Sequence, residues 1–228
     1  MAQHMATKRA GNGRGPGLAT PEITGLVGVS NDAEERIAYQ MPYTVAVTLR
    51  GVADLLFHRY STEEVAEKAS AAKGSKAKKT DNVESYLYRN DADHICMPGR
   101  YLQRAIVEAA RFHQDPRSPR KMAKDLVAAA VSVTPQLAPM LVNGEPTADW
   151  DYLDRQRVVI QRSAITRERP AFRDGWAVEF DILVLLPEYV GTAFLHRLVT
   201  DSGKFIGLGD FRPSYGRFQL VSFAEVEA

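Results

Sequence analysis

The sequence predicts an α+β fold, in which helices pack on an antiparallel sheet in the ferredoxin-like (RRM-type) order β-α-β-β-α-β. Two observations predict it. An alternating strand pattern is followed by an amphipathic helix pattern in the first half of the chain, and the second half repeats this order. We expect one domain over residues 41–228, with insertions at about 60–96 and 135–175, preceded by a flexible tail over residues 1–40. Residues 1–23 of this tail are rich in glycine and cations.

Three patterns define the first half of the domain. In residues 43–50 apolar and polar side chains alternate strictly, which is typical of a half-buried strand. Residues 100–112 place apolar side chains on one side at helical spacing and arginines on the other side, which predicts an amphipathic helix. The apolar run over residues 126–134 is expected to form a buried strand.

The second half repeats this order. Residues 176–186 alternate again and predict a strand. A helix is expected over residues 187–203, because Pro187 suits a helix start and Gly203 suits the position just past a helix end. A glycine-rich loop, GKFIGLGDFRPSYGRF (residues 203–218), then leads into a final strand, RFQLVSF.

Composition narrows the function classes. The 29 Lys and Arg residues nearly balance the 28 Asp and Glu residues, so the net charge is +1 and only local clusters of cations could attract a polyanion. The single cysteine, Cys96, excludes an intrachain disulfide framework and favours a reducing compartment. No apolar run reaches the ~18 residues of a membrane span and no signal-peptide pattern is visible, so we expect a cytoplasmic protein without a membrane partner.

Several segments combine cations with aromatic residues or glycines, as surfaces that bind single strands do. Residues 155–173 contain six arginines and one glutamate, and in a strand Arg167 and Arg169 would share a face. The glycine-rich loop would let its backbone approach phosphates closely, and the first helical turn at Arg100 offers free N–H groups. The side chains expected to bind nucleic acid are His58, Arg59, Arg100, Arg104, Arg162, Arg167, Arg169, Arg173, Lys204, Arg212, Tyr215 and Arg217.

Each of these segments has a structural alternative. The arginines of residues 155–173 could pair with acids on a solvated hairpin, and the glycine-rich loop could only turn the chain between packed elements. Asp91 and Asp93, with His94, could hold a divalent metal or help to cut a phosphodiester, or they could form a hydrated turn. No nucleophile triad is recognisable, and we expect no metal and no other cofactor.

Three segments in this order resemble the RAMP superfamily, specifically the backbone subunits of CRISPR effector complexes. They are the strand at residues 43–50 with the loop after it, HICMPGRYLQRAIVEAARF (residues 94–112), and residues 176–223 with the glycine-rich loop. The resemblance implies that Pro-Gly opens the first helix, that the glycine-rich segment contacts RNA, and that the subunits polymerise along a guide RNA.

The sequence departs from this family in two places. Arg100, Tyr101 and Arg104 stand where the family has small residues with lysine or glycine, and FRPSYGRF replaces a denser glycine run. RNA-cleaving members of the family carry a catalytic aspartate in a loop, so the resemblance implies Asp91 and Asp93 as candidates for that role. The sequence is also similar to proteins of unassigned function from tailed phages and prophages.

We therefore predict a protein that binds single-stranded nucleic acid, RNA in preference to DNA, without strong sequence preference, and that self-assembles along the strand as a homo-oligomer or filament. This prediction includes no enzymatic activity. Two alternatives stay open. One is a metal-dependent ribonuclease of the RAMP type that uses Asp91, Asp93 and His94, and the other is a phage structural or assembly protein whose arginines make subunit contacts.

Overall fold

The computed structural model describes residues 40–60, 62, 66, 70, 82–160 and 163–226, all within one compact unit. The predicted tail, up to residue 39, lies outside the described residues. In chain order the elements are β1 (Tyr43–Gly51), β2 (Leu55–Leu56), η1 (Val83–Tyr86), β3 (Cys96–Pro98), α3 (Gly99–Ala109), η2 (Ala110–Phe112), β4 (Gln114–Asp115), β5 (Ser118–Met122), α4 (Lys124–Ala130), β6 (Val131–Thr134), β7 (Leu137–Pro139), β8 (Leu141–Val142), β9 (Glu145–Pro146), β10 (Tyr152–Ile160), β11 (Ser163–Phe172), β12 (Ala177–Val184), α5 (Thr192–Asp201), η3 (Ser202–Ile206) and β13 (Phe218–Val226).

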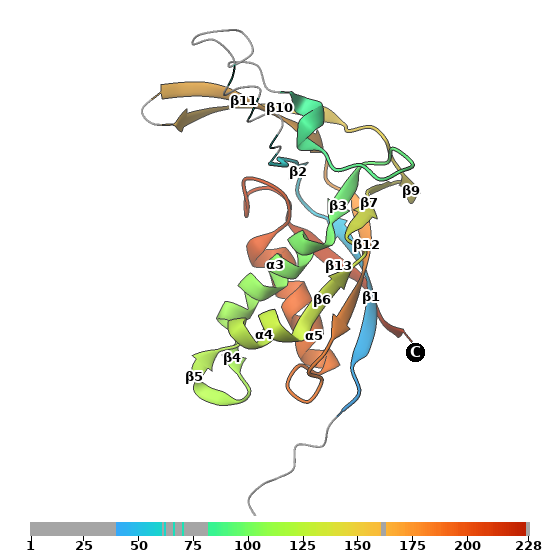
Figure 1. Cartoon of the computed structure of the whole chain (residues 1–228), viewed down its shortest axis with the longest axis vertical. Coiled ribbons are helices and arrows are strands. Elements are labelled where there is room, and N and C mark those ends of the chain that lie inside the picture. The colour runs from blue at the N-terminus through green and yellow to red at the C-terminus, as the bar shows by residue number, and fades with distance from the viewer. Residues whose placement is uncertain are drawn as a thin grey trace, which may run out of the picture. The chain divides into compact units, whose positions relative to one another are not determined.

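The main sheet has the strand order β13-β1-β12-β8-β9, with β6 also paired to β12, and every pairing in it is antiparallel. Along the chain α3 lies between β1 and β6, and α5 lies between β12 and β13. Figure 1 shows α3, α4 and α5 together on one side of this sheet. The predicted α+β class is confirmed. The ferredoxin-like assignment stays a prediction, which the strand order β13-β1-β12-β6 favours.

The core forms between the sheet and these helices, because each contributes one apolar face. The alternation in β1 buries Val45, Val47 and Leu49 completely or almost completely. On the facing side α3 buries Leu102 and Ile106, which are one helical turn apart. Full burial of one such side chain contributes about 1.5–3 kcal/mol, so these contacts fix α3 on the sheet and direct its polar side outward.

The prediction of one strand over residues 126–134 is wrong in part. The helix α4 ends at Ala130, and only the last four residues of this range form the strand β6. A short apolar run is compatible with a buried strand or a buried helix, so periodicity alone does not separate them. Three consecutive alanines, ending at Ala130, favour the helix because alanine has the highest helix propensity.

The helix predicted over residues 187–203 differs at both ends. It begins at Thr192, because Gly191 before it has extended backbone angles (φ −73°, ψ 165°). At the other end a wider helical turn, η3, follows directly, and Gly203 lies inside that turn. A Cβ atom on Gly203 would overlap the carbonyl oxygen of Phe218, so glycine lets β13 pack against η3 at this point.

The strands β10 and β11 form a hairpin that extends away from the main sheet (Figure 1). Its base is fixed by the pairing of β11 with β2 and by two hydrogen bonds. The Tyr152 hydroxyl donates to Asp54 at 2.6 Å, and the Gln156 amide donates to the Tyr215 hydroxyl at 3.0 Å. Arg162 lies outside the described residues. None of the described helices has the length and apolar character needed to cross a membrane.

Candidate nucleic-acid interface

Four side chains form a group of cations on aromatic rings, which we call the Arg59–Arg100 cluster: Arg59, Tyr88, Arg100 and Tyr101. The guanidinium carbon of Arg59 lies 5.3 Å from the centre of the Tyr88 ring. That of Arg100 lies 5.5 Å from the Tyr88 ring centre and 5.9 Å from the Tyr101 ring centre. Arg100 also donates a hydrogen bond of 2.7 Å to the Tyr88 hydroxyl. These contacts hold both guanidinium groups in place while both arginines stay exposed.

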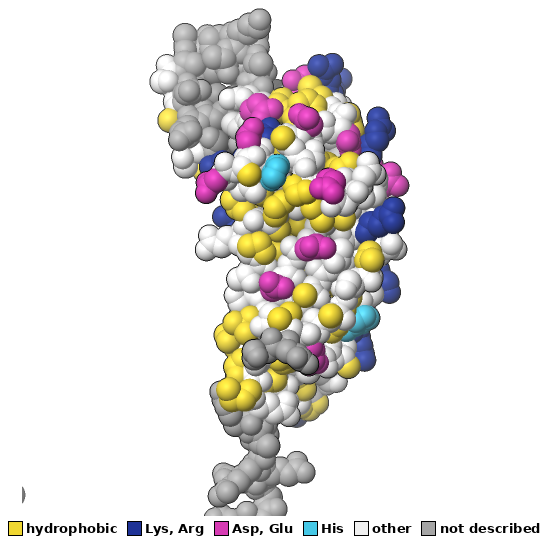
Figure 2. Space-filling model, turned by 90° about the vertical axis from the view of Figure 1, so that its right-hand side faces the viewer, with side chains coloured by type: hydrophobic (Ala, Val, Ile, Leu, Met, Phe, Trp, Pro, Cys, Tyr) yellow, Lys and Arg dark blue, Asp and Glu magenta, His cyan; other side chains and the backbone are white. Residues whose placement is uncertain are grey.

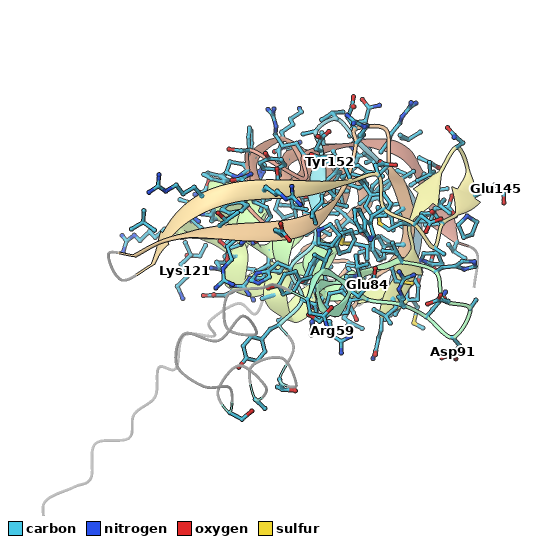
Figure 3. The ribbon with its side chains drawn as sticks, turned by 90° about the horizontal axis from the view of Figure 1, so that it is seen from above. Arg59, Glu84, Asp91, Lys121, Glu145 and Tyr152 are labelled. Carbon is cyan, nitrogen blue, oxygen red and sulfur yellow. The ribbon has the colours of Figure 1, made fainter. Side chains whose placement is uncertain are left out.

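The charges of this cluster are not neutralised within the described part of the chain, where no carboxylate lies within ion-pair distance of Arg59 or Arg100. Glu84 lies on the same side of the ribbon as Arg59 in Figure 3. Its carboxylate instead accepts hydrogen bonds from Arg89 at 3.1 Å and from the Trp150 indole at 3.4 Å. Among the described residues, the cluster therefore carries two positive charges and no negative one.

The opening of α3 positions Arg100. The backbone N–H of Gly99 donates to the carbonyl oxygen of Gln136 at 3.0 Å, and a Cβ atom on Gly99 would collide with the carbonyl oxygen of Pro135. Glycine therefore lets the first turn of α3 lie directly against the segment between β6 and β7. Pro98 before it has no side chain that could cap the helix, so the N–H groups that follow that of Gly99 in the first turn add to the attraction of Arg100 for anions.

An open pocket of about 580 Å³ adjoins the cluster, with Tyr88 and Arg100 in its wall. Pro98 and Leu137 supply apolar surface, and Gln103 supplies an amide. Among the described residues that line it, none is acidic. The volume lies within the range of about 300–1,000 Å³ that is usual for small-ligand sites, so a nucleoside-sized group fits in it.

The exposed side of α3 extends the interface beyond the cluster. Arg104 is exposed one turn after Arg100. At the far end the side chains of Phe112 and Phe205 are 59% and 51% exposed, and their rings meet edge to face at 5.7 Å. Lys204, beside Phe205, is also exposed. At a rise of 1.5 Å per helical residue, Phe112 lies about 18 Å along the helix from Arg100. A nucleic-acid strand lying along α3 would span this distance.

The structure places two of the predicted residues around a carboxylate instead. Arg169 is only 7% exposed, and its Nε donates to the Asp210 carboxylate at 2.6 Å. Its guanidinium carbon lies 4.3 Å from the centre of the Phe211 ring. The Nδ1 atom of His58 lies 3.6 Å from the same carboxylate oxygen. The burial of Arg169 argues against the predicted phosphate contact and indicates that it fixes the C-terminal loop to β11.

Some arginines of the β10–β11 hairpin already contact other side chains of the protein. Arg155 donates to Glu168 across the two strands at 2.8 Å, as the structural alternative for this segment requires. The guanidinium carbon of Arg173 lies 5.2 Å from the centre of the Tyr152 ring, and Arg173 is exposed. Arg167 is half-buried. Of these, Arg173 has the combination of exposure and an aromatic neighbour that suits a strand contact.

The glycines of the C-terminal loop have a structural role. Gly209 and Gly216 have φ angles of 74° and 70°, which favour glycine. A Cβ atom on Gly209 would overlap the carbonyl oxygen of Leu56, and one on Gly216 would overlap that of Leu208. These glycines let the loop pack against itself and against β2. This is what we expect if the loop only turns the chain between packed elements.

The polar side chains of the same loop differ in their exposure. Arg212 and Arg217 are exposed, although Arg212 lies within 3.4 Å of the Gly207 carbonyl oxygen, to which it donates. Tyr215 is half-buried and accepts the hydrogen bond from Gln156. Burial first, and then the charges of nearby aspartates, raise the pKa of Tyr215 above its ordinary value. Tyr215 therefore joins the loop to the hairpin, and the exposed arginines are the parts of the loop that suit phosphate contact.

The segment with Asp91 and Asp93 forms a hydrogen-bonded turn. The Asn90 side chain accepts hydrogen bonds from the backbone N–H groups of Ala92 (3.1 Å) and His94 (3.0 Å), and Asp93 has a φ angle of 62°. Arg89 donates to the carbonyl oxygen of Asp93 at 2.7 Å. Figure 3 places Asp91 away from Arg59. Within the described ranges, no three His, Cys, Asp or Glu side chains gather where they could hold a metal ion.

The outer face of the sheet is a less suitable surface for phosphates. On β12, Glu179 and Asp181 are exposed on this face. Figure 2 shows acidic and apolar side chains mixed over the side of the molecule that carries β1, with Lys and Arg mainly along one edge. Because acidic groups repel phosphates, this face suits a polyanion less well than the side of α3 does.

No family model matches the sequence, and no curated protein matches it. A similar solved chain comes from the cryo-EM structure of the Type III-B Cmr-beta bound to cognate target RNA, with a TM-score of 0.47 and 10% sequence identity. The likeness covers 82% of this chain and 61% of that chain, so this chain spans less than two thirds of its neighbour's length. A likeness of this size carries no functional argument, and the RAMP resemblance stays a prediction.

Proposed function

We propose that this protein binds single-stranded nucleic acid, RNA in preference to DNA, and that the Arg59–Arg100 cluster is the centre of its binding surface. The observation that carries the proposal is the pair of exposed guanidinium groups held on tyrosine rings beside an open pocket. Arginine suits this task because its planar fork bonds to phosphate bidentately and also stacks on bases.

Two physical terms supply the affinity. Each phosphate that a guanidinium group neutralises releases counterions from the strand, and each base that stacks on an aromatic ring contributes about 1–3 kcal/mol. The exposed rings of Phe112 and Phe205 offer stacking surface at the far end of α3. Neither term depends on the identity of the base, so binding has no strong sequence preference.

We also propose that copies of the protein assemble along one strand as a homo-oligomer or filament. The net charge of +1 lets neighbouring copies approach without strong repulsion. The β10–β11 hairpin projects from the main sheet and carries Val159, whose side chain is 72% exposed, so it offers apolar surface to a neighbouring copy.

The test of binding is fluorescence anisotropy with labelled single strands of RNA and of DNA, each about 16 nucleotides long, which is the upper site size of common single-strand-binding domains. We expect saturable binding to both, tighter for RNA, that weakens strongly between about 50 and 200 mM salt. Binding that is absent, or that does not change with salt, contradicts the proposal. Mass measurements on longer strands test assembly, since the number of bound copies should rise with strand length.

The same experiment separates the two alternatives. Strand cleavage that needs Mg²⁺ and disappears in Asp93→Ala would replace this proposal by the metal-dependent ribonuclease. Self-association at equal strength with and without nucleic acid, in the absence of strand binding, would replace it by the phage structural or assembly protein.

A further inference from the structure

We infer that Asp210 is a built-in competitor of phosphate at the Arg59–Arg100 cluster, and that Arg169 controls this competition by holding the Asp210 carboxylate away. This inference rests on the proposed function and adds a regulation of the same surface. While Arg169 holds Asp210, the cluster is open to a strand. When Arg169 turns to another carboxylate, Asp210 is released and lowers the affinity of the cluster for phosphate.

The first argument is the position of Asp210 beside the cluster. Its carboxylate oxygen lies 3.6 Å from Nδ1 of His58, which directly precedes Arg59 in the chain. Burial first, then the contact with Tyr88 and the charge of Asp210, raise the pKa of the Tyr101 hydroxyl. Asp210 therefore acts on a side chain of the cluster. A carboxylate at this distance repels a bound phosphate unless a cation neutralises it.

The second argument is that Arg169 supplies this neutralising cation. Its Nε donates to the Asp210 carboxylate at 2.6 Å from a position that is only 7% exposed, where a charged pair is poorly screened. The guanidinium carbon also lies 4.3 Å from the centre of the Phe211 ring, so the same side chain holds two consecutive residues of the loop. The structure therefore shows the state in which Asp210 is held.

The third argument is a second acceptor within reach of Arg169. In the β10–β11 ladder Asp154 is directly opposite Arg169, and side chains directly opposite each other lie on the same face of the sheet. The Oδ2 atom of Asp154 and the Nη1 atom of Arg169 are both buried, and neither has a hydrogen-bond partner among the described residues. Because a buried polar atom without a partner costs free energy, a bond between these two atoms favours turning Arg169 away from Asp210.

The fourth argument is the backbone of the held loop. Phe211 has a φ angle of 51°, in the left-handed region that is unfavourable for a residue with a bulky side chain. Its contact with Arg169 offsets this cost only while Arg169 stays in place. The contacts of Arg169 thus favour the held position, whereas the backbone of Phe211 and the two unpartnered atoms favour release.

The test is anisotropy with the labelled RNA strand, at a temperature where melting curves show every variant to be folded. Arg169→Ala releases Asp210 and should weaken binding at least about fivefold relative to the unchanged protein. Asp210→Asn keeps the shape of the side chain and removes its charge, so this variant should bind at least as tightly as the unchanged protein. Because the competitor is then absent, combining the two substitutions should restore the affinity to within about twofold of that of the unchanged protein.

Two further variants complete the set. Arg155→Ala is the matched control, because Arg155 also pairs with a carboxylate, that of Glu168, on the same two strands. This control removes the same charge and leaves Asp210 held, so binding should not change. Asp154→Asn removes the charge of the second acceptor, so Arg169 should stay on Asp210 and binding should tighten about twofold or more.

The outcomes separate this inference from the proposed function. Binding that stays weak in the double variant overturns the inference, because Arg169 then contacts the strand itself or only supports the loop. Weaker binding in Asp210→Asn, equal losses in Arg155→Ala and Arg169→Ala, or no gain in Asp154→Asn overturns it as well. Each of these results leaves the proposed function in place. Absence of binding by the unchanged protein overturns both.

Discussion

Replacing both arginines of the Arg59–Arg100 cluster gives the most quantitative test of the interface. Arg59→Ala with Arg100→Ala removes two exposed cations that stand on tyrosine rings and leaves the buried faces of the fold untouched. For a single strand, each neutralised phosphate adds about 0.7 to the slope of log K against log salt. The slope should therefore become shallower by about 1.4 in the double variant.

This change in slope has a direct consequence for measured affinities. Between about 50 and 200 mM salt, log salt changes by about 0.6, so the slope difference amounts to about 0.8 in log K. We therefore consider the binding constant of the unchanged protein divided by that of the double variant. This ratio should be about sevenfold larger at the low salt concentration than at the high one. Anisotropy titrations at four or more salt concentrations measure both slopes.

The matched control is Arg50→Ala with Arg120→Ala, which removes the same total charge from exposed positions outside the interface. This control should keep the slope of the unchanged protein, because it loses charge but no phosphate contact. Equal slopes for the cluster variant and the unchanged protein would refute the reasoning. An equal loss of slope in both double variants would refute it as well, since net charge alone would then explain the binding.

Three further predictions concern stability. Gly209→Val should lower the melting temperature by about 4–8 °C. A valine here would have to adopt left-handed backbone angles and would collide with β2, which together cost roughly 2 kcal/mol of stability. An unchanged melting curve would contradict this. Arg169→Ala should lower the free energy of unfolding by about 1–3 kcal/mol in urea titrations, because it leaves the Asp210 carboxylate without its closest partner. The hydrogen bond from Lys124, above all, holds the pKa of Glu108 below its ordinary value of 4.5. Because the lowered pKa stabilises the fold only where the carboxylate is charged, Glu108→Gln should cost less than about 1 kcal/mol at pH 7. This difference should disappear as the pH falls through the lowered pKa, and a difference that persists there would refute its electrostatic origin.

The main strands and the first helix were predictable because each has one buried face. In β1 and β12 the burial alternates residue by residue, and in α3 it follows the helical period, so apolar periodicity carries the information. The run before Val131 was predicted wrongly because all of it is apolar, which removes the periodicity. Pattern therefore identifies elements that face both core and solvent, and it fails for short buried ones.

The candidate interface was predictable only in part. Charge and position led us to expect nucleic-acid contacts at Arg59 and Arg100, which stays a prediction. Tyr88, whose ring contacts both arginines, lies in a long insertion where no periodic pattern marks it. Arg169 was expected on a strand face that contacts a strand of nucleic acid, whereas the structure buries it against Asp210, which is 41 residues away in the sequence. Sequence shows which residues carry charge, whereas the choice between a solvent-exposed cation and a buried ion pair depends on contacts that only the fold creates.

The position of β1 in the sheet has a consequence for how the protein folds. β1 is the earliest strand of the described chain, yet its two neighbours in the sheet, β12 and β13, are among the latest. Its pairing therefore has to wait until β12 has emerged from the ribosome, and loop closure over that distance must precede any gain from pairing. Until then the apolar side of β1 has no sheet to join, so the nascent chain should depend on chaperones during this interval.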